Sequence, residues 1–316
     1  MVRLRPYFLG FKTTNYCWYR CPHCCENSGP HNPREFLPAH IITGYIDQAV
    51  KDPLFNQSVV FTGGEIMSAY RFGDENYVKT LLAHSMKHDL GIDIKTNAGW
   101  AGTNIEDKIC DDLAQTIADN PTAYPPQISL SLDRFHTNAM RKNARVIQAM
   151  VARDSNVSFH LSGFGAQQID ADTEILMKQL ANAGLDVQMA FSMRDPNDVQ
   201  PLWVINGKTV VRYSYGMLRA AGRGTKLENT FDVPDHQFSI FEPDMTQVNV
   251  IEHGGRFRLG EAWPKNITTT WRHPDGTARS LREIRNRIVN ATRRAELEYM
   301  LRNGRRLINL NDFKTR

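Results

Sequence analysis

The sequence has no long apolar run and few cysteines, and each shortage excludes a class of protein. No hydrophobic stretch approaches the ~20 residues that a membrane-spanning helix needs, so we expect no membrane segment. Residues 1–6 lack the apolar core of a secretory signal peptide. The five cysteines are an odd number, which disfavours a framework of disulfides. We therefore expect a cytoplasmic protein in a reducing compartment.

The overall composition is that of an ordinary globular chain. Hydrophobic residues make up 41% of the sequence, charged residues make up 23%, and the net charge is +4. A chain of 316 residues is long enough for one large domain with an appendage. Size and composition therefore favour a globular enzyme.

Four of the five cysteines lie close together, directly after a predicted buried strand at residues 7–12. Cys17, Cys21 and Cys24 follow the spacing C-x-x-x-C-x-x-C, and Cys25 comes next. Thiolates are soft ligands that suit zinc or iron–sulfur clusters. Structural zinc sites usually draw on two separated cysteine pairs, and the sequence offers one tight triplet. A 4Fe-4S cluster held by three cysteines is the better match, and a zinc-binding module is the alternative.

A second motif follows the next predicted strand. Residues 59–65 read VVFTGGE, so the strand ends in Gly63, Gly64 and Glu65. Alone, the glycines could form an ordinary turn, and Glu65 could be an acid favoured at a helix start. In this order, and after predicted strands, the two motifs resemble those of the radical S-adenosylmethionine (radical SAM) superfamily.

The resemblance implies two cofactors and a reaction. In that family three cysteines hold one 4Fe-4S cluster, here Cys17, Cys21 and Cys24, and the fourth iron binds the methionine part of SAM. The Gly63–Glu65 stretch would contact the SAM ammonium. An electron donor such as flavodoxin or ferredoxin reduces the cluster, and SAM is cleaved to a 5′-deoxyadenosyl radical that abstracts hydrogen from a substrate.

Strand and helix patterns alternate along the first two-thirds of the chain. Predicted strands at residues 58–62, 92–96, 127–132, 157–161 and 186–191 recur about every thirty residues, the size of one βα unit. Such alternation predicts a parallel sheet with right-handed crossovers. Six units are too few for a closed eight-stranded barrel, and the resemblance implies an α/β fold, an open partial (β/α)6 TIM-like barrel. Chemistry in such barrels gathers at the carboxyl ends of the strands.

Polar residues after the later strands are candidates for SAM contacts. Alternation places Ser129, Ser131 and Asp133 on one face of the fourth strand, which we expect to line the barrel. The resemblance implies that Ser129 or Ser131 contacts the SAM sugar and that Asn97 approaches the ribose; Asn97 could equally be a turn residue. His23 lies in the loop whose backbone contacts adenine in the family.

The resemblance places the catalytic candidates nearer the substrate. These are Asp133, Arg134 and His136, with Ser162 as a further candidate for a SAM contact. Cys25 would close the open iron if it were a ligand, so we expect it to be a bystander. The remaining cysteine, Cys110, is predicted to be a small buried residue of a helix.

The pattern changes near residue 200. We predict a radical SAM barrel at residues 1–200 and a C-terminal α+β extension at 201–316 that covers the barrel. Asn206-Gly207 predicts a tight hairpin turn, and residues 248–259 predict a second hairpin before a helix from 280. This order faintly resembles the SPASM or twitch extension. No cysteine follows Cys110, so we expect no auxiliary cluster.

The substrate is the least defined part of the prediction. Residues 219–224 and the order of the tail resemble peptide-modifying members of the superfamily, which favours a peptide or protein substrate. The alternative is a small molecule such as a nucleoside, sugar or amino acid. Residues 279–316 carry eleven Lys/Arg against four Asp/Glu and could bind nucleic acid, but a solvated helix face explains such runs more often.

Overall fold

The computed structural model describes residues 7–24, 27–53, 55–195, 198–216, 247–252, 256–259, 267–270, 273–284 and 286. The strands are β1 (Tyr7–Lys12), β2 (Phe55–Thr62), β3 (Gly91–Thr96), β4 (Gln127–Ser131), β5 (Ser158–Phe164), β6 (Val187–Asp195), β7 (Asp198–Ile205), β8 (Thr209–Gly216), β9 (Gln247–Glu252), β10 (Arg256–Leu259) and β11 (Ile267–Thr270). The helices are α1 (Ala39–Ala49), α2 (Ser68–Arg71), α3 (Asn76–Lys87), α4 (Glu106–Asp119), α5 (Ala139–Ala152) and α6 (Ala166–Asn182).

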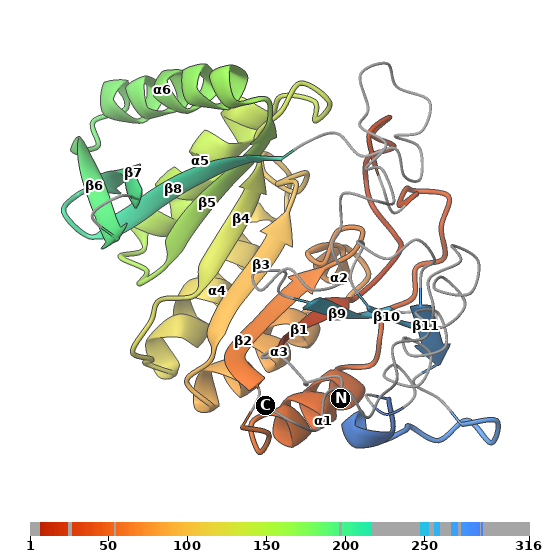
Figure 1. Ribbon diagram of the computed structural model, residues 1–316. Coiled ribbons are helices and arrows are strands. Elements are labelled where there is room, and N and C mark those ends of the chain that lie inside the picture. Colours follow the sequence, from red (N-terminus) through yellow and green to blue (C-terminus); the bar gives the residue numbers. More distant parts are fainter. Residues whose placement is uncertain are drawn as a thin grey trace, which may run out of the picture.

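These strands form one 11-stranded sheet with the order β11-β10-β9-β1-β2-β3-β4-β5-β8-β7-β6 (Figure 1). From β9 to β8 every neighbouring pair is parallel. The strands beyond β9 and beyond β8 are antiparallel, and the strand order has two distinct ends. The predicted α/β fold with an open parallel sheet is confirmed.

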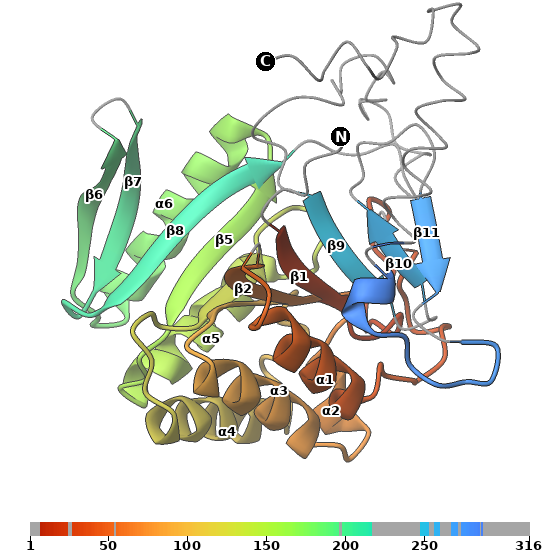
Figure 2. The same ribbon diagram turned by 60° about the horizontal axis from the view of Figure 1, so that its bottom comes forward.

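The long helices form one layer against one face of this sheet (Figure 2). Neighbouring helices contact each other in the order α1-α3-α4-α5-α6. The strand residues that face this layer are apolar and fully buried, namely Leu9, Phe11, Val59, Phe61, Ile94, Leu130, Phe159, Leu161 and Val211. Side chains alternate along a strand, so the residues between them face away from the helices. That opposite face is the predicted barrel interior, and Ser129 and Ser131 lie on it as expected.

The sixth parallel strand is not where the sequence predicted it. Residues 186–191 do form a strand, but β6 pairs antiparallel with β7 at the sheet edge, while β8 lies parallel to β5. Burial gives the reason: Val211 of β8 is completely buried, whereas Met189 and Phe191 of β6 stay largely exposed. The strand with the better apolar face takes the place beside β5 and under α6.

The predicted hairpin turn at Asn206-Gly207 is confirmed, and it sets this arrangement. Both residues have positive φ, 51° and 68°, and the Lys208 amide bonds to the Ile205 carbonyl at 3.1 Å. This geometry is typical of a type I′ turn, which matches the twist of paired strands. The predicted boundary at residue 200 falls inside β7, so this hairpin continues the main sheet.

The second predicted hairpin is also confirmed, because β9 and β10 pair antiparallel, with Phe257 opposite Ile251. The sequence did not predict that β9 would lie parallel to β1. Residues 281–284 are helical, as expected after residue 280, and Ile284 is fully buried against the core. The Tyr45 hydroxyl of α1 donates to the Arg279 carbonyl at 2.9 Å and so holds this segment in place. Residues 219–224, Cys25 and residues 287–316 lie outside the described ranges.

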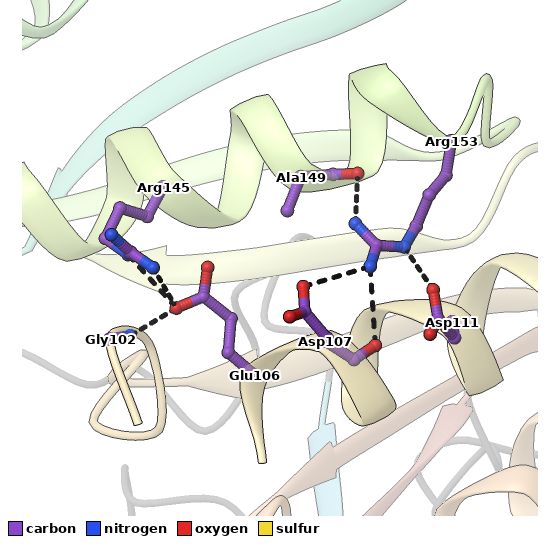
Figure 3. A network of polar contacts seen from close by, with 7 residues as sticks. All are labelled: Gly102, Glu106, Asp107, Asp111, Arg145, Ala149 and Arg153. Carbon is purple, nitrogen blue, oxygen red and sulfur yellow. Dashed lines mark hydrogen bonds and ion pairs between the residues drawn. The ribbon is translucent and has the colours of Figure 1, made fainter. Parts of the chain in front are cut away.

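A polar clamp joins α4 to α5 (Figure 3). At the start of α4, the Glu106 carboxylate accepts hydrogen bonds from Gly102 N and from Arg145 Nε and Nη2, the last two at 3.0 and 2.9 Å. Arg153, at the end of α5, reaches back to Asp107 and Asp111 of α4. Acidic residues in a first helical turn also interact favourably with the helix dipole. These contacts fix the α4–α5 pair beneath β3 and β4.

Candidate cluster and cofactor site

The three motif cysteines lie in one loop at the carboxyl end of β1. The loop is tied to the neighbouring strand by Thr13 N, which bonds to the Thr62 carbonyl at 2.9 Å. Cys17 and Cys21 are buried, Cys24 is half-buried, and all three are free thiols. Burial first, and then the nearby Glu65 carboxylate, raise the pKa of the Cys17 thiol. A thiolate at this position therefore needs a metal or another cation to stabilise it.

The Gly63-Gly64-Glu65 motif is bound to this loop through its backbone. Gly64 N donates to the Thr14 carbonyl at 2.7 Å, and Glu65 N donates to the Tyr16 carbonyl at 2.8 Å. A Cβ atom on Gly64 would overlap the Tyr16 carbonyl oxygen, and one on Gly63 would come within 2.5 Å of the Thr14 oxygen. Gly63 also has a φ of +123°, which side-chain-bearing residues rarely adopt. Both glycines are therefore required for this close approach.

Glu65 is completely buried beneath the loop. Its carboxylate accepts hydrogen bonds from Asn97 N at 2.9 Å, Met67 N at 3.1 Å and the Thr96 hydroxyl at 2.8 and 3.0 Å. Burial raises the pKa of Glu65 to about 7, against the opposing effect of these three donors. Because a carboxylate offers about four acceptor positions, it has capacity for one further donor.

Asn97 has both side-chain polar atoms engaged within the protein. Its Nδ2 lies 3.2 Å from Cys17 Sγ, and its Oδ1 accepts from Gly99 N at 2.8 Å. The sequence predicts either a contact with the SAM ribose or a turn role for Asn97, and the structure shows its side-chain amide on a motif thiol. The contact resembles the outer-shell hydrogen bonds that orient ligands and tune metal centres.

Asp133 and His136 form a buried pair beside the second motif cysteine. His136 Nδ1 lies 2.9 Å from Asp133 Oδ2, and their side chains are only 10% and 6% exposed. Burial alone would lower the pKa of His136, but hydrogen bonds to Asp133 and Cys21 raise it to about 10. These two predicted catalytic residues therefore lie against the cysteine loop. Arg134 is exposed and lies over the Phe135 ring instead.

His23 packs in the same region. Its ring lies 5.1 Å from the His136 ring and 4.6 Å from the Phe135 ring, measured between centroids. Phe164, from the end of β5, contacts His23 at 5.0 Å. The loop between the last two motif cysteines is thus braced by aromatic residues after β4 and β5.

The two predicted serines of β4 lie on the inner face but below the loop. Ser129 is buried and donates to Asp93 Oδ1 at 2.6 Å. Ser131 lies nearer the carboxyl end of the strand, in register with Ser162 of β5. Ser131 and its neighbour Ser162 therefore lie nearer the carboxyl ends of their strands than Ser129 does.

Sequence reasoning missed several residues that shape the site. Thr96 joins Glu65 to Trp100, whose indole Nε1 donates to the Thr96 hydroxyl at 3.1 Å. Tyr19 of the cysteine loop receives a hydrogen bond from Lys142, whose Nζ also lies 4.7 Å from the Tyr19 ring centroid. Thr96 is the last residue of β3, and this place at the carboxyl end of a strand was the one sequence signal that it belongs to the site. Tyr19 and Lys142 lie 123 positions apart, so no local sequence pattern predicts their contact.

The residues present fit an iron–sulfur cluster. Around the cysteine triplet, Trp18 Nε1 and Asn15 Oδ1 are buried without a hydrogen-bond partner among the described residues. A single zinc, with Zn–S bonds about 2.3 Å long, would draw its sulfur ligands close together. Among the described residues, the groups whose ligand atoms all lie within 4.8 Å of one another do not include the cysteine triplet, so its sulfurs are spread more widely than one zinc would require. The groups that meet this distance are His23–Asp133–His136 and Asp47–His84–His88.

None of the described helices combines the length and the apolar character needed to cross a bilayer.

No family model matches the chain, and no curated protein matches its sequence. Several solved structures are similar to it, among them the following two. Streptococcus suis SuiB shares 14% identity at a TM-score of 0.36, and the match covers 80% of this chain and 60% of SuiB. The chain is also similar to native anSMEcpe with bound AdoMet, at 13% identity and a TM-score of 0.41, over 82% of this chain and 76% of that one.

Proposed function

We propose that the chain is a radical SAM enzyme with one 4Fe-4S cluster on Cys17, Cys21 and Cys24. The observation that carries the proposal is the backbone clamp between the Gly63–Glu65 motif and the cysteine loop. Two motifs, 39 positions apart from Cys24 to Gly63 and each at the carboxyl end of a parallel strand, are thereby held together at one end of the sheet. This edge is where open α/β sheets place their ligands.

The chain's own residues have distinct parts in this proposal. The three thiolates hold the cluster, while Asn97 and His136 donate to the sulfurs of Cys17 and Cys21. The Glu65 carboxylate receives the SAM ammonium in its remaining acceptor position. When bound and reduced, the cluster supplies the electron that cleaves SAM to methionine and a 5′-deoxyadenosyl radical. The protein positions the substrate C–H bond and excludes water.

Cysteine replacement tests the proposal. After anaerobic reconstitution, Cys17→Ala, Cys21→Ala or Cys24→Ala should abolish both iron–sulfide binding and SAM cleavage. Cys110→Ala is the matched control, because Cys110 is buried in α4 and should leave both unchanged. A protein that binds zinc but acquires no iron–sulfur absorption would refute the proposal and favour a zinc module.

For the substrate, we propose a peptide or protein side chain that is modified at an unactivated carbon. The order of the tail supports this, with a β9–β10 hairpin before the helical residues 281–284. The reduced enzyme would be incubated with SAM in deuterated buffer together with peptides encoded near the gene. Deuterium in a peptide, with 5′-deoxyadenosine formed only in its presence, would support the proposal. Turnover of a free nucleoside, sugar or amino acid instead would refute it.

A further inference from the structure

Four polar side chains form one line across the inner face of the sheet. The register pairs Lys95 of β3 with Ser129 of β4, Ser129 with His160 of β5, and His160 with Arg212 of β8. Neighbouring strands lie about 4.8 Å apart, so the four residues follow one another directly. We call them the inner row.

The inner row faces away from the helices. Leu161 and Val211, which alternate with His160 and Arg212, are completely buried in the core on the helix side. Tyr213 packs against the same core, on the helix side of β8. Arg212 must therefore point to the opposite side.

One end of the inner row is electrically balanced. Lys95 Nζ lies 3.0 Å from Asp93 Oδ2, and Ser129 Oγ donates to Asp93 Oδ1 at 2.6 Å. Next to them, His160 Nδ1 lies 3.5 Å from Ser129 Oγ and 3.3 Å from Ser162 Oγ. With Nδ1 turned to these hydroxyls, the Nε2 of His160 is left to meet another group.

The other end of the inner row carries an unbalanced positive charge. Arg212 is half-buried and forms no hydrogen bond or ion pair with any other described residue. Burial is the largest cause that lowers the pKa of His160. The positive charges of Lys95 and Arg212 lower it further, while the Asp93 carboxylate opposes them. A half-buried cation without a partner is partly desolvated, so this end of the row would be stabilised by an anion.

The inner row lies close to the proposed cluster. Lys95 precedes Asn97 by two residues, a distance of about 6.6 Å along a strand, and Asn97 contacts Cys17. Between the row and the strand ends lies a second line of hydroxyls from Ser131, Ser162 and Ser214. Arg212 and His160 lie two to three strands along the sheet from Lys95, below the carboxyl ends of their own strands.

We propose that Arg212 and His160 form a subsite that binds a carboxylate or phosphate group of the substrate, with the Ser162 hydroxyl donating to His160 Nδ1 and orienting its ring. The inference rests on the proposed function only where the bound anion is identified as part of the substrate. The anion-binding groups themselves do not depend on it. The planar guanidinium fork of Arg212 suits a two-pronged contact with either anion. His160 donates from Nε2 in its neutral form, so the subsite places no second full charge beside Arg212.

Anion titration of the full-length chain tests the subsite without cluster or SAM. Inorganic phosphate and acetate are added separately at ionic strength held constant with sodium chloride, and the His160 imidazole resonances are followed by NMR after assignment with His160→Asn. We expect a saturable shift with at least one anion. Saturation by acetate alone would identify a carboxylate subsite, and saturation by phosphate alone would identify a phosphate subsite.

Variants locate the effect. Arg212→Gln should weaken the anion response about tenfold or more, since it removes charge-assisted hydrogen bonds. Arg212→Lys should retain part of it. Arg141→Gln is the control, because Arg141 is exposed on α5. An unaltered response in Arg212→Gln, or no response of His160 to either anion in the natural chain, would overturn the subsite.

The failure of this proposal can be told apart from failure of the proposed function. Arg212→Gln should still acquire iron and sulfide, bind SAM and keep the melting temperature of the natural chain. Loss of the cluster in this variant would show a structural effect. A natural chain that binds anions at His160 but acquires no cluster would retain the subsite and refute the radical SAM assignment.

Discussion

The side-chain amide of Asn97 donates a hydrogen bond to the thiol of Cys17, with 3.2 Å between Nδ2 and Sγ. Residues 80 positions apart thus meet because β1 and β3 both end at the same edge of the sheet. Asn97 is held in this orientation by Gly99 N, which donates to its Oδ1. The backbone amide of the same residue donates to Glu65. Asn97 therefore connects the proposed cluster site with the proposed SAM site.

Asn97→Ala should lower the reduction potential of the reconstituted cluster. A donor to a ligand sulfur stabilises the more negative, reduced cluster, so its removal favours the oxidised state. The shift should be on the order of 50 mV, the one-electron equivalent of roughly 1 kcal/mol. A redox titration followed by EPR measures it. Asn104→Ala, in an exposed loop position, should leave the potential unchanged. Equal potentials in all three proteins, at full iron content, would contradict the role of Asn97.

Gly64→Ala should prevent cluster assembly or unfold the site. The added methyl group would overlap the Tyr16 carbonyl, so the cysteine loop would have to move away from β2. Gly44→Ala is the control, because a Cβ at Gly44 in α1 meets nothing within 4 Å. Alanine favours a helix, so the control should gain about 0.5–1 kcal/mol of stability. Iron content and thermal unfolding distinguish the two variants. A Gly64→Ala protein with full iron content would show that the clamp is not required.

SAM affinity should fall as the pH is lowered through about 7. Burial raises the pKa of Glu65 to about 7, so the carboxylate becomes protonated below this pH and can no longer pair with an ammonium. The charged groups that act on Glu65 are Cys17 and His136, and neither should titrate near pH 7 in this site. Calorimetry between pH 6 and 8 would record the dependence.

Glu65→Gln provides the matched variant for this pH dependence. It should weaken SAM binding by about 1.5–3 kcal/mol at pH 8, the range for a hydrogen bond to a charged group, with the iron content intact. Its affinity should lack the fall below about pH 7 that protonation of Glu65 causes. An affinity in the natural chain that is flat across this range, or unchanged in Glu65→Gln, would argue against Glu65 as the ammonium partner.

Glu106→Gln should lower the free energy of unfolding by about 1–2 kcal/mol. The substitution removes the charge that Arg145 and Gly102 N share at the start of α4, and the Glu106 side chain is only 10% exposed. Asp107→Asn is the comparison, since the Asp107 side chain is 89% exposed and its pair with Arg153 should contribute about 0.5 kcal/mol or less. Urea unfolding measures both. Equal effects would show that burial does not set the strength of this clamp.

The sequence by itself determined the class of fold and the two motifs. Strand and helix periodicities are local properties, so they predicted the strands from β1 to β5 and the long helices between them, but not the short helix α2. The spacing of Cys17, Cys21 and Cys24 is likewise readable without a structure. Since parallel strands end at a common edge, the sequence also predicted that the motifs lie together.

Only the tertiary structure decided which strand lies beside β5 and what the polar side chains contact. β6 and β8 both read as strands, and competition for the apolar surface of α6 placed β8 inside. The sequence correctly placed Asp133, His136 and Asn97 near strand ends. The bond between Asp133 and His136, and the bond from Asn97 to Cys17, depend on loop conformations and on residues far away in the chain. A periodic pattern fixes the face on which a residue lies; its partner across the site is fixed by packing, which no local pattern encodes.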